Sequence, residues 1–154
     1  MAGEQYNEIV MKAAAAIIAT SGGGSTVVSG TVAVGLPAGA VQLTNSNGVA
    51  ANAQAQATFA ATSGKTNYIT GMVITGAGST AGGTVTASLA GPLGGSLFYA
   101  VTAPIGATVP FAPIVITFDP PLAASAANVA LTATVPALGT GNVASSVSIT
   151  GFRV

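Results

Sequence analysis

The sequence predicts an all-β fold: an antiparallel β-sandwich of jelly-roll type, preceded by a short N-terminal helix or arm. Three observations predict this class. From residue 26 onward, apolar residues alternate with small polar ones at a period of two, which is typical of half-buried strands. Gly, Pro and Asn interrupt this alternation at short intervals, as turns between seven or eight short strands do. The length of 154 residues suits a single globular domain.

Residues 1–25 are predicted to form the arm, which consists of a helix and a glycine-rich linker. Apolar residues recur at helical spacings at Tyr6, Ile9, Val10 and Ile17, so they share one stripe. Three consecutive glycines at 22–24 end the helix and supply a joint. An isolated helix of this length is marginal in water, so its stripe needs a surface to pack on. Two interpretations stay open: the surface belongs to the same domain, or it belongs to a neighbouring subunit.

Residues 26–54 are predicted to be one strand followed by a long loop. The strand has an apolar face because its valines alternate with small residues, and residues 35–54 are rich in Gly, Pro and Asn. The Asn47-Gly48 pair within this loop is typical of a tight turn. The arm and this strand together supply our candidate residues for docking or oligomerisation, which are Tyr6, Ile9, Val10, Ile17, Val28, Val32 and Val34.

Residues 55–154 are predicted to form the β-sandwich. Each strand segment is bounded by Gly, Pro or Asn, and several show a clear alternation. In residues 129–135, for example, Val129, Leu131, Ala133 and Val135 alternate with Ala130, Thr132 and Thr134. The predicted strands are 55–61, 67–75, 84–89, 96–101, 114–118, 129–135 and 143–152. Spacing of this kind favours a jelly roll over a repeat fold, because no longer period recurs.

The composition excludes most function classes. Half of the residues are hydrophobic and only 4% are charged, whereas roughly 25% is usual for a soluble domain. Three basic residues are too few for the patch that nucleic-acid binding needs. Without Cys or His, the chain lacks the commonest metal ligands and the commonest general base. We expect no enzyme activity, cofactor, metal or nucleic-acid partner, and no membrane partner, since no run of about 20 apolar residues occurs.

Two local patterns invite a chemical interpretation and do not support it. Gly64-Lys65-Thr66 has the ending of a phosphate-binding loop, but Phe59 stands where that motif needs its first glycine. We expect a turn there, leading into a strand. The aromatic residues Tyr68, Phe98, Tyr99, Phe111, Phe118 and Phe152 could stack on a sugar, but each lies within or beside an apolar strand, so we expect them to pack in the core.

The predicted outer surface is nearly free of charge. After Lys12, the only ionised side chains are Lys65, Asp119 and Arg153. A free monomer usually carries interspersed charges for solubility, whereas an uncharged surface loses little hydration when it is buried against protein. We therefore expect a homo-oligomer, with a homotrimer as the first choice. Ordinary variation in charge is the alternative.

The strand-rich block resembles small virion proteins of tailed bacteriophages and prophages, over about residues 55–154. The runs that carry this resemblance are SGKTNYITG (63–71), LAGPLGG (89–95), FDPPLAASAAN (118–128), GTGN (139–142) and ITGF (149–152). Such proteins use jelly-roll domains to decorate capsids and to build fibres or tails. No functional residues transfer, because the resemblance rests on turns and strands.

The resemblance implies a capsid decoration protein, or cement protein, on the surface of the phage head. Its partners would be other copies of itself and the major capsid protein or other virion proteins. The alternative is a structural module of a head fibre, tail or baseplate that binds the host surface. A virion-associated hydrolase is disfavoured, because the chain has only three carboxylates and no convergent set of catalytic groups.

Overall fold

Eight strands make up the described part of the computed structural model, which comprises residues 36–49 and 51–154. Their bounds are β1 Val41–Val49, β2 Ala55–Phe59, β3 Asn67–Gly76, β4 Gly83–Ala90, β5 Leu97–Ala103, β6 Ile114–Ala123, β7 Leu131–Val135 and β8 Ser145–Arg153. The seven strands predicted within residues 55–154 are all present. The helix predicted within residues 1–25 and the strand predicted over 26–34 lie outside the described residues.

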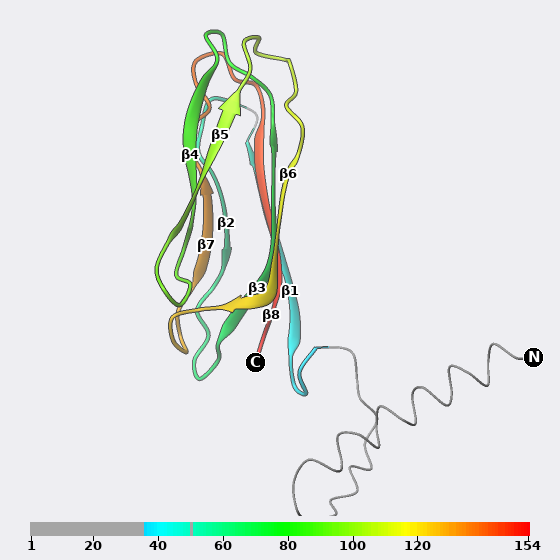
Figure 1. Ribbon diagram of the computed structural model, residues 1–154, viewed down its shortest axis with the longest axis vertical. Coiled ribbons are helices and arrows are strands. Elements are labelled where there is room, and N and C mark those ends of the chain that lie inside the picture. The colour runs from blue at the N-terminus through cyan, green and yellow to red at the C-terminus, as the bar shows by residue number, and fades with distance from the viewer. Residues whose placement is uncertain (1–35, 50) are drawn as a thin grey trace, which may run out of the picture. The chain divides into compact units, whose positions relative to one another are not determined.

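The strands form two antiparallel sheets of four, in the orders β1-β8-β3-β6 and β2-β7-β4-β5 (Figure 1). The pairing is nested: the first strand pairs with the last, the second with the seventh, the third with the sixth, and the fourth with the fifth. Every connection except the one from β4 to β5 therefore crosses from one sheet to the other. This is the arrangement of an eight-stranded jelly roll, so the predicted fold class is confirmed.

The core lies between the two sheets and is built from alternate residues of the strands. On β3, for example, Ile69, Met72 and Ile74 are buried. The neighbouring positions face outward, because side chains alternate across a strand. Other buried apolar residues are Ala57, Phe59, Leu89, Val101, Leu131, Val135, Val147 and Ile149. Alanine supplies many inward positions, which allows the two sheets to pack closely.

β1 occupies a segment that the sequence predicted to be loop. Residues 41–49 pair in continuous register with β8, from Val41 opposite Arg153 to Val49 opposite Ser145. The Asn47-Gly48 pair lies inside this strand rather than in a turn. The prediction of a connection over 35–54 was wrong at this point, because pairing with β8 overrides the weak intrinsic strand propensity of Asn and Gly.

β6 is continuous in the chain but pairs with β3 in two pieces. Gly71 lies opposite Thr117 and Ile69 lies opposite Leu122, so residues 118–121 have no counterparts on β3. Beyond this irregularity the chain crosses toward the turn between β4 and β5, where Leu93 donates its backbone N–H to the carbonyl of Ala123 at 2.8 Å (Figure 1). The exposed Asp119, Pro120 and Pro121 occupy the irregular stretch.

Candidate functional surface

The strands carry almost no charge. None of β2, β7, β4 and β5 contains an Asp, Glu, Lys or Arg, and the other sheet contains only Asp119 on β6 and Arg153 on β8. Lys65, the remaining charged residue of the described part, lies before β3. Any function of these faces therefore depends on shape, apolar contact and neutral hydrogen bonds.

Three pairs of threonine hydroxyl groups on the outer faces bond to each other across neighbouring strands. The paired oxygens are those of Thr58 and Thr132 at 3.1 Å, Thr84 and Thr102 at 3.1 Å, and Thr70 and Thr150 at 3.4 Å. The amide of Gln56 similarly donates to the hydroxyl of Thr134 at 3.3 Å. Because these groups have partners within the chain, covering them with another protein leaves fewer unsatisfied polar atoms than covering free hydroxyls.

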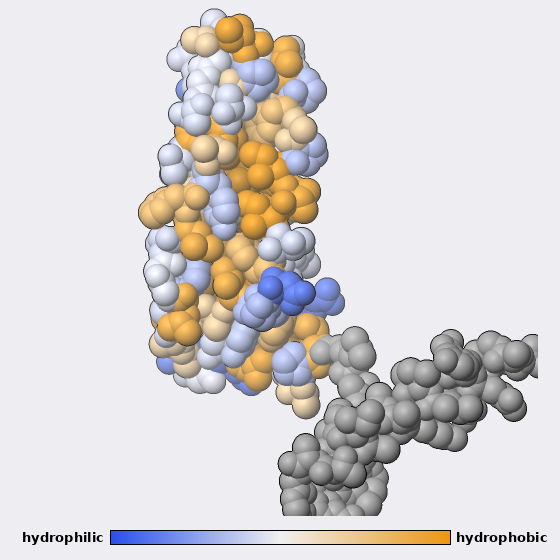
Figure 2. Space-filling model, viewed as in Figure 1, coloured by the Kyte–Doolittle hydropathy of each residue, from blue (hydrophilic) through white to orange (hydrophobic). Residues whose placement is uncertain are grey.

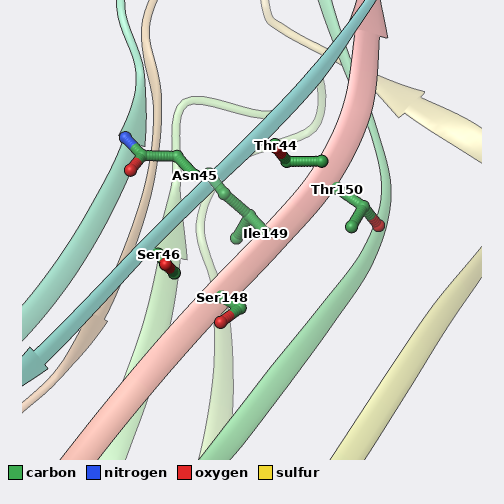
Figure 3. Close-up of a pocket in the computed structure, with 6 residues that line it drawn as sticks. All are labelled: Thr44, Asn45, Ser46, Ser148, Ile149 and Thr150. Atoms are coloured by element: carbon green, nitrogen blue, oxygen red, sulfur yellow. The ribbon is translucent and has the colours of Figure 1, made fainter.

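A shallow depression of about 410 Å³ crosses β1 and β8 on the sheet that contains them. Its lining residues are Thr44, Asn45, Ser46, Ser148, Ile149 and Thr150. The four hydroxyl side chains lie spread along the two strands and do not converge on one point (Figure 3). No titratable residue lines the depression, so it offers a neutral contact surface rather than a general acid or base.

The segment around Lys65 is a turn, as predicted. Gly64 has a φ of 69°, and its N–H donates to the side-chain oxygen of Asn128 at 2.7 Å. Thr66 then exchanges backbone hydrogen bonds with Val154, at 3.0 and 3.1 Å, and β3 begins one residue later. A strand rather than a helix follows the turn, so the backbone dipoles that a phosphate-binding loop uses are not provided here.

The aromatic residues differ in burial, and the prediction of core packing was wrong for two of them. Phe59 and Phe152 are buried. Tyr68, which was predicted to pack in the core, is half-buried outside the core cluster, and its ring stacks on Phe152 with centroids 4.8 Å apart. Tyr99, Phe111 and Phe118 are half-buried against the core. Phe98, which was predicted to pack in the core, is 68% exposed because it points outward from the edge strand β5.

The remaining predictions concern the N-terminal arm, metal ligands and membrane-spanning helices. The candidate arm residues, namely Tyr6, Ile9, Val10, Ile17, Val28, Val32 and Val34, lie outside the described residues. Within the described ranges, no three His, Cys, Asp or Glu residues lie together as metal ligands would. In residues 36–49 and 51–154 there is also no helix long and apolar enough to cross a membrane.

Sequence reasoning missed the apolar side of the sandwich, where β5 and β6 are the edge strands of their sheets. Phe98 and Val115 point outward from these strands, on the outer faces of the two different sheets, and are 68% and 65% exposed.

Comparison of the chain with protein-family models, with curated proteins and with solved structures gave no match. Functional inference therefore rests on the fold, the surface and the sequence patterns.

Proposed function

We propose that the protein is a structural protein of bacteriophage particles: a capsid decoration protein that binds over major capsid subunits as a homotrimer and stabilises the head. The observation that carries this proposal is the nearly uncharged surface of a jelly roll, on which three pairs of threonine hydroxyls bond to each other across neighbouring strands. Such faces can be buried against protein without stripping water from charges, which is the most expensive part of forming a large interface.

The fold and the sequence patterns point in the same direction. Eight-stranded jelly rolls are recurrent in viral capsid proteins, although lectins and cupins also use them. The runs that resemble phage virion proteins now fall largely on turns and strand ends, as in 89–95 between β4 and β5 and 118–128 after the regular part of β6. These positions are the ones where a jelly roll needs Gly, Pro and Asn.

Copy number in purified particles tests the proposal. We expect quantitative mass spectrometry of phage particles from the source culture to give a simple fraction of the major capsid protein, as trimers arranged over a regular lattice require. A few dozen copies or fewer would instead favour the alternative, a head-fibre, tail or baseplate module. Absence from the particles would remove the virion assignment altogether.

A further inference from the structure

The edge strands on the two sides of the sandwich differ in how they contact each other. On one side, β1 and β2 lie close together, and side-chain amides join them: Asn45 donates to the carbonyl of Thr58 at 2.7 Å. The backbone N–H of Gln56 donates to the side-chain oxygen of Asn47 at 3.1 Å. We call this side the amide seam. Its edge strands protect each other, because polar side chains occupy hydrogen-bonding groups that a foreign strand would otherwise use.

The opposite side is apolar and lacks such ties. We call it the apolar seam and define it by the inward-facing residues of the edge strands β5 and β6, which are Leu97, Tyr99, Ile114, Ile116 and Phe118. All five pack against the core but are only half-buried. Figure 2 shows hydrophobic residues gathered between β5 and β6. Among the described residues, no hydrogen bond joins β5 to β6.

Within residues 36–49 and 51–154, β5 has none of the usual protections of an edge strand. Its seven residues, Leu97–Ala103, contain no proline and no charge. In the same part of the chain it pairs only with β4, along one of its two edges. On β6, the first five residues, Ile114–Phe118, also lack charge and proline. Asp119, Pro120 and Pro121 follow in the second half of the strand. Monomeric proteins block such edges with lysine, proline or a covering segment, because a free apolar edge recruits another strand.

The directions of the two strands determine how copies can meet. A connection at one end of the sandwich, residues 104–113, joins the end of β5 to the start of β6, so these strands run in opposite directions (Figure 1). A rotation axis parallel to the strands preserves these directions. β5 of one copy then lies antiparallel to β6 of the next, which is the orientation that antiparallel pairing requires.

We propose that the apolar seam is the self-association surface, and that its occupant is a second copy of this chain, with the free edge of β5 paired to the free edge of β6 on the neighbour. This inference deepens the proposed function and rests on it for the number of copies, three. One repeated contact uses both free edges of every copy and closes a ring. Neither edge brings a charge into the paired region, so an uncharged edge is its best match.

The first experiment places a charge on the β5 edge and a matched charge on the amide seam. Ala100 is exposed and points outward from β5, and Gln56 is exposed on β2, the corresponding edge of the same sheet. By light scattering after gel filtration, we expect the full chain and Q56K to show three times the chain mass of 14.6 kDa. We expect A100K to fall to the single-chain mass while its circular dichroism is unchanged. A monomeric wild-type protein, or equal masses for A100K and Q56K, would overturn the inference.

Crosslinking distinguishes β5–β6 pairing from other contacts, and it does not require a destabilising variant. The chain has no cysteine, so single-cysteine variants report only the introduced thiols. We expect A100C chains mixed with V115C or T117C chains to be joined by a short bismaleimide. A100C alone and A100C mixed with S46C, on the outward side of β1, should stay unlinked. Linking of A100C to itself would show a β5–β5 contact and overturn the inference, as would failure of both β6 variants to link.

These results separate failure of this inference from failure of the proposed function. If the protein is present on particles in lattice-related numbers but is monomeric in solution, the capsid decoration role holds, and the self-association surface is wrong. Loss of particle binding in the A100K variant of a monomeric protein would assign the β5 edge to a contact with the capsid protein instead. A trimer that crosslinks through β5 and β6 but is absent from particles supports this inference and removes the virion role.

Discussion

Arg153 donates from its Nε to the side-chain oxygen of Asn67 at 2.9 Å, near the C-terminal end of the chain. The amide nitrogen of Asn67 in turn donates to the carbonyls of Phe59, Ala60 and Val129, at 3.1–3.2 Å. One buried side chain thus connects β3, the end of β2 with the residue after it, the segment before β7 and the last residue of β8. The same guanidinium also donates from Nη2 to the carbonyl of Ala60 at 2.8 Å.

Replacing Asn67 with Ala is expected to lower the free energy of unfolding by about 3 kcal/mol, because buried carbonyls and the Arg153 Nε lose their partner. The side chain is 1% exposed, so water cannot easily replace it. Urea denaturation of N67A against the wild type measures the loss. S148A, on the outer face of β8, is the control and should change stability by less than about 0.5 kcal/mol. A loss below about 1 kcal/mol in N67A would contradict the role assigned to this amide.

Gly151 is required on β8 by a close backbone approach. A Cβ at this position would collide with the carbonyl oxygen of Tyr68 and would meet the ring of Phe59 at 2.9 Å. We expect G151A to be destabilised by about 1–3 kcal/mol through overpacking. Gly48 on β1 is the matched control, because a Cβ there would meet the side chain of Ser146 at an ordinary 3.7 Å. Equal stabilities of G151A and G48A would show that the strands shift to accept the methyl group.

The amide seam gives a prediction about edge protection. N47A removes the acceptor of the Gln56 N–H and should lower the free energy of unfolding by only about 1 kcal/mol. The loss is small because the N–H is exposed and water can replace the lost acceptor. The larger effect is expected in hydrogen exchange, where the Gln56 amide should lose its protection while core amides of β3 keep theirs. Unchanged exchange at Gln56 in N47A would mean that the side-chain bond does not protect this edge.

Burial raises the pKa of the Tyr99 hydroxyl above its ordinary value of 10.0. The folded protein therefore holds this proton more tightly than the unfolded chain does. Below about pH 10 Tyr99 is protonated in both states, so it does not change the free energy of unfolding with pH. As pH rises through the raised pKa, the free energy of unfolding falls, because the unfolded chain releases the proton more readily. Y99F lacks this group, so urea denaturation on both sides of pH 10 should show a smaller alkaline loss than in the wild type. An identical loss in both proteins would contradict the assignment to Tyr99.

The seven strands beyond residue 55 could be predicted because their signals are local. Alternation in β7 and β8, and breakers such as Gly91-Pro92 between β4 and β5, are visible without any tertiary information. β1 could not be predicted in the same way. Its Asn45 and Asn47 are poor strand residues, and they belong in the strand because their amides reach Thr58 and Gln56 on β2. A single sequence does not show these long-range partners.

The candidate surface was predictable in chemistry but not in position. Composition alone indicated an uncharged exterior. Phe98, however, lies in a run, LFYAVTA, that looks like a buried strand from its sequence. The side that Phe98 faces depends on the alternation along β5, in which Leu97, Tyr99 and Val101 face inward and Phe98 faces outward. The run is apolar at both kinds of position, so its sequence does not show which side chains face the core.

The scarcity of charge makes a prediction about ionic strength. If burial of neutral faces and pairing of strand edges drive association, salt has few ion pairs to screen. We expect the affinity for capsids, and the trimer–monomer equilibrium, to change by less than about threefold between 50 mM and 500 mM sodium chloride, because a change of this size is under 1 kcal/mol. Sodium sulfate should strengthen association by promoting apolar burial. Sedimentation of capsids with bound protein across a salt series measures the first quantity. A steep loss of binding with sodium chloride would assign docking to the few charged residues, Lys65, Asp119 and Arg153, or to charged residues outside 36–154, and would contradict a contact made by the neutral faces.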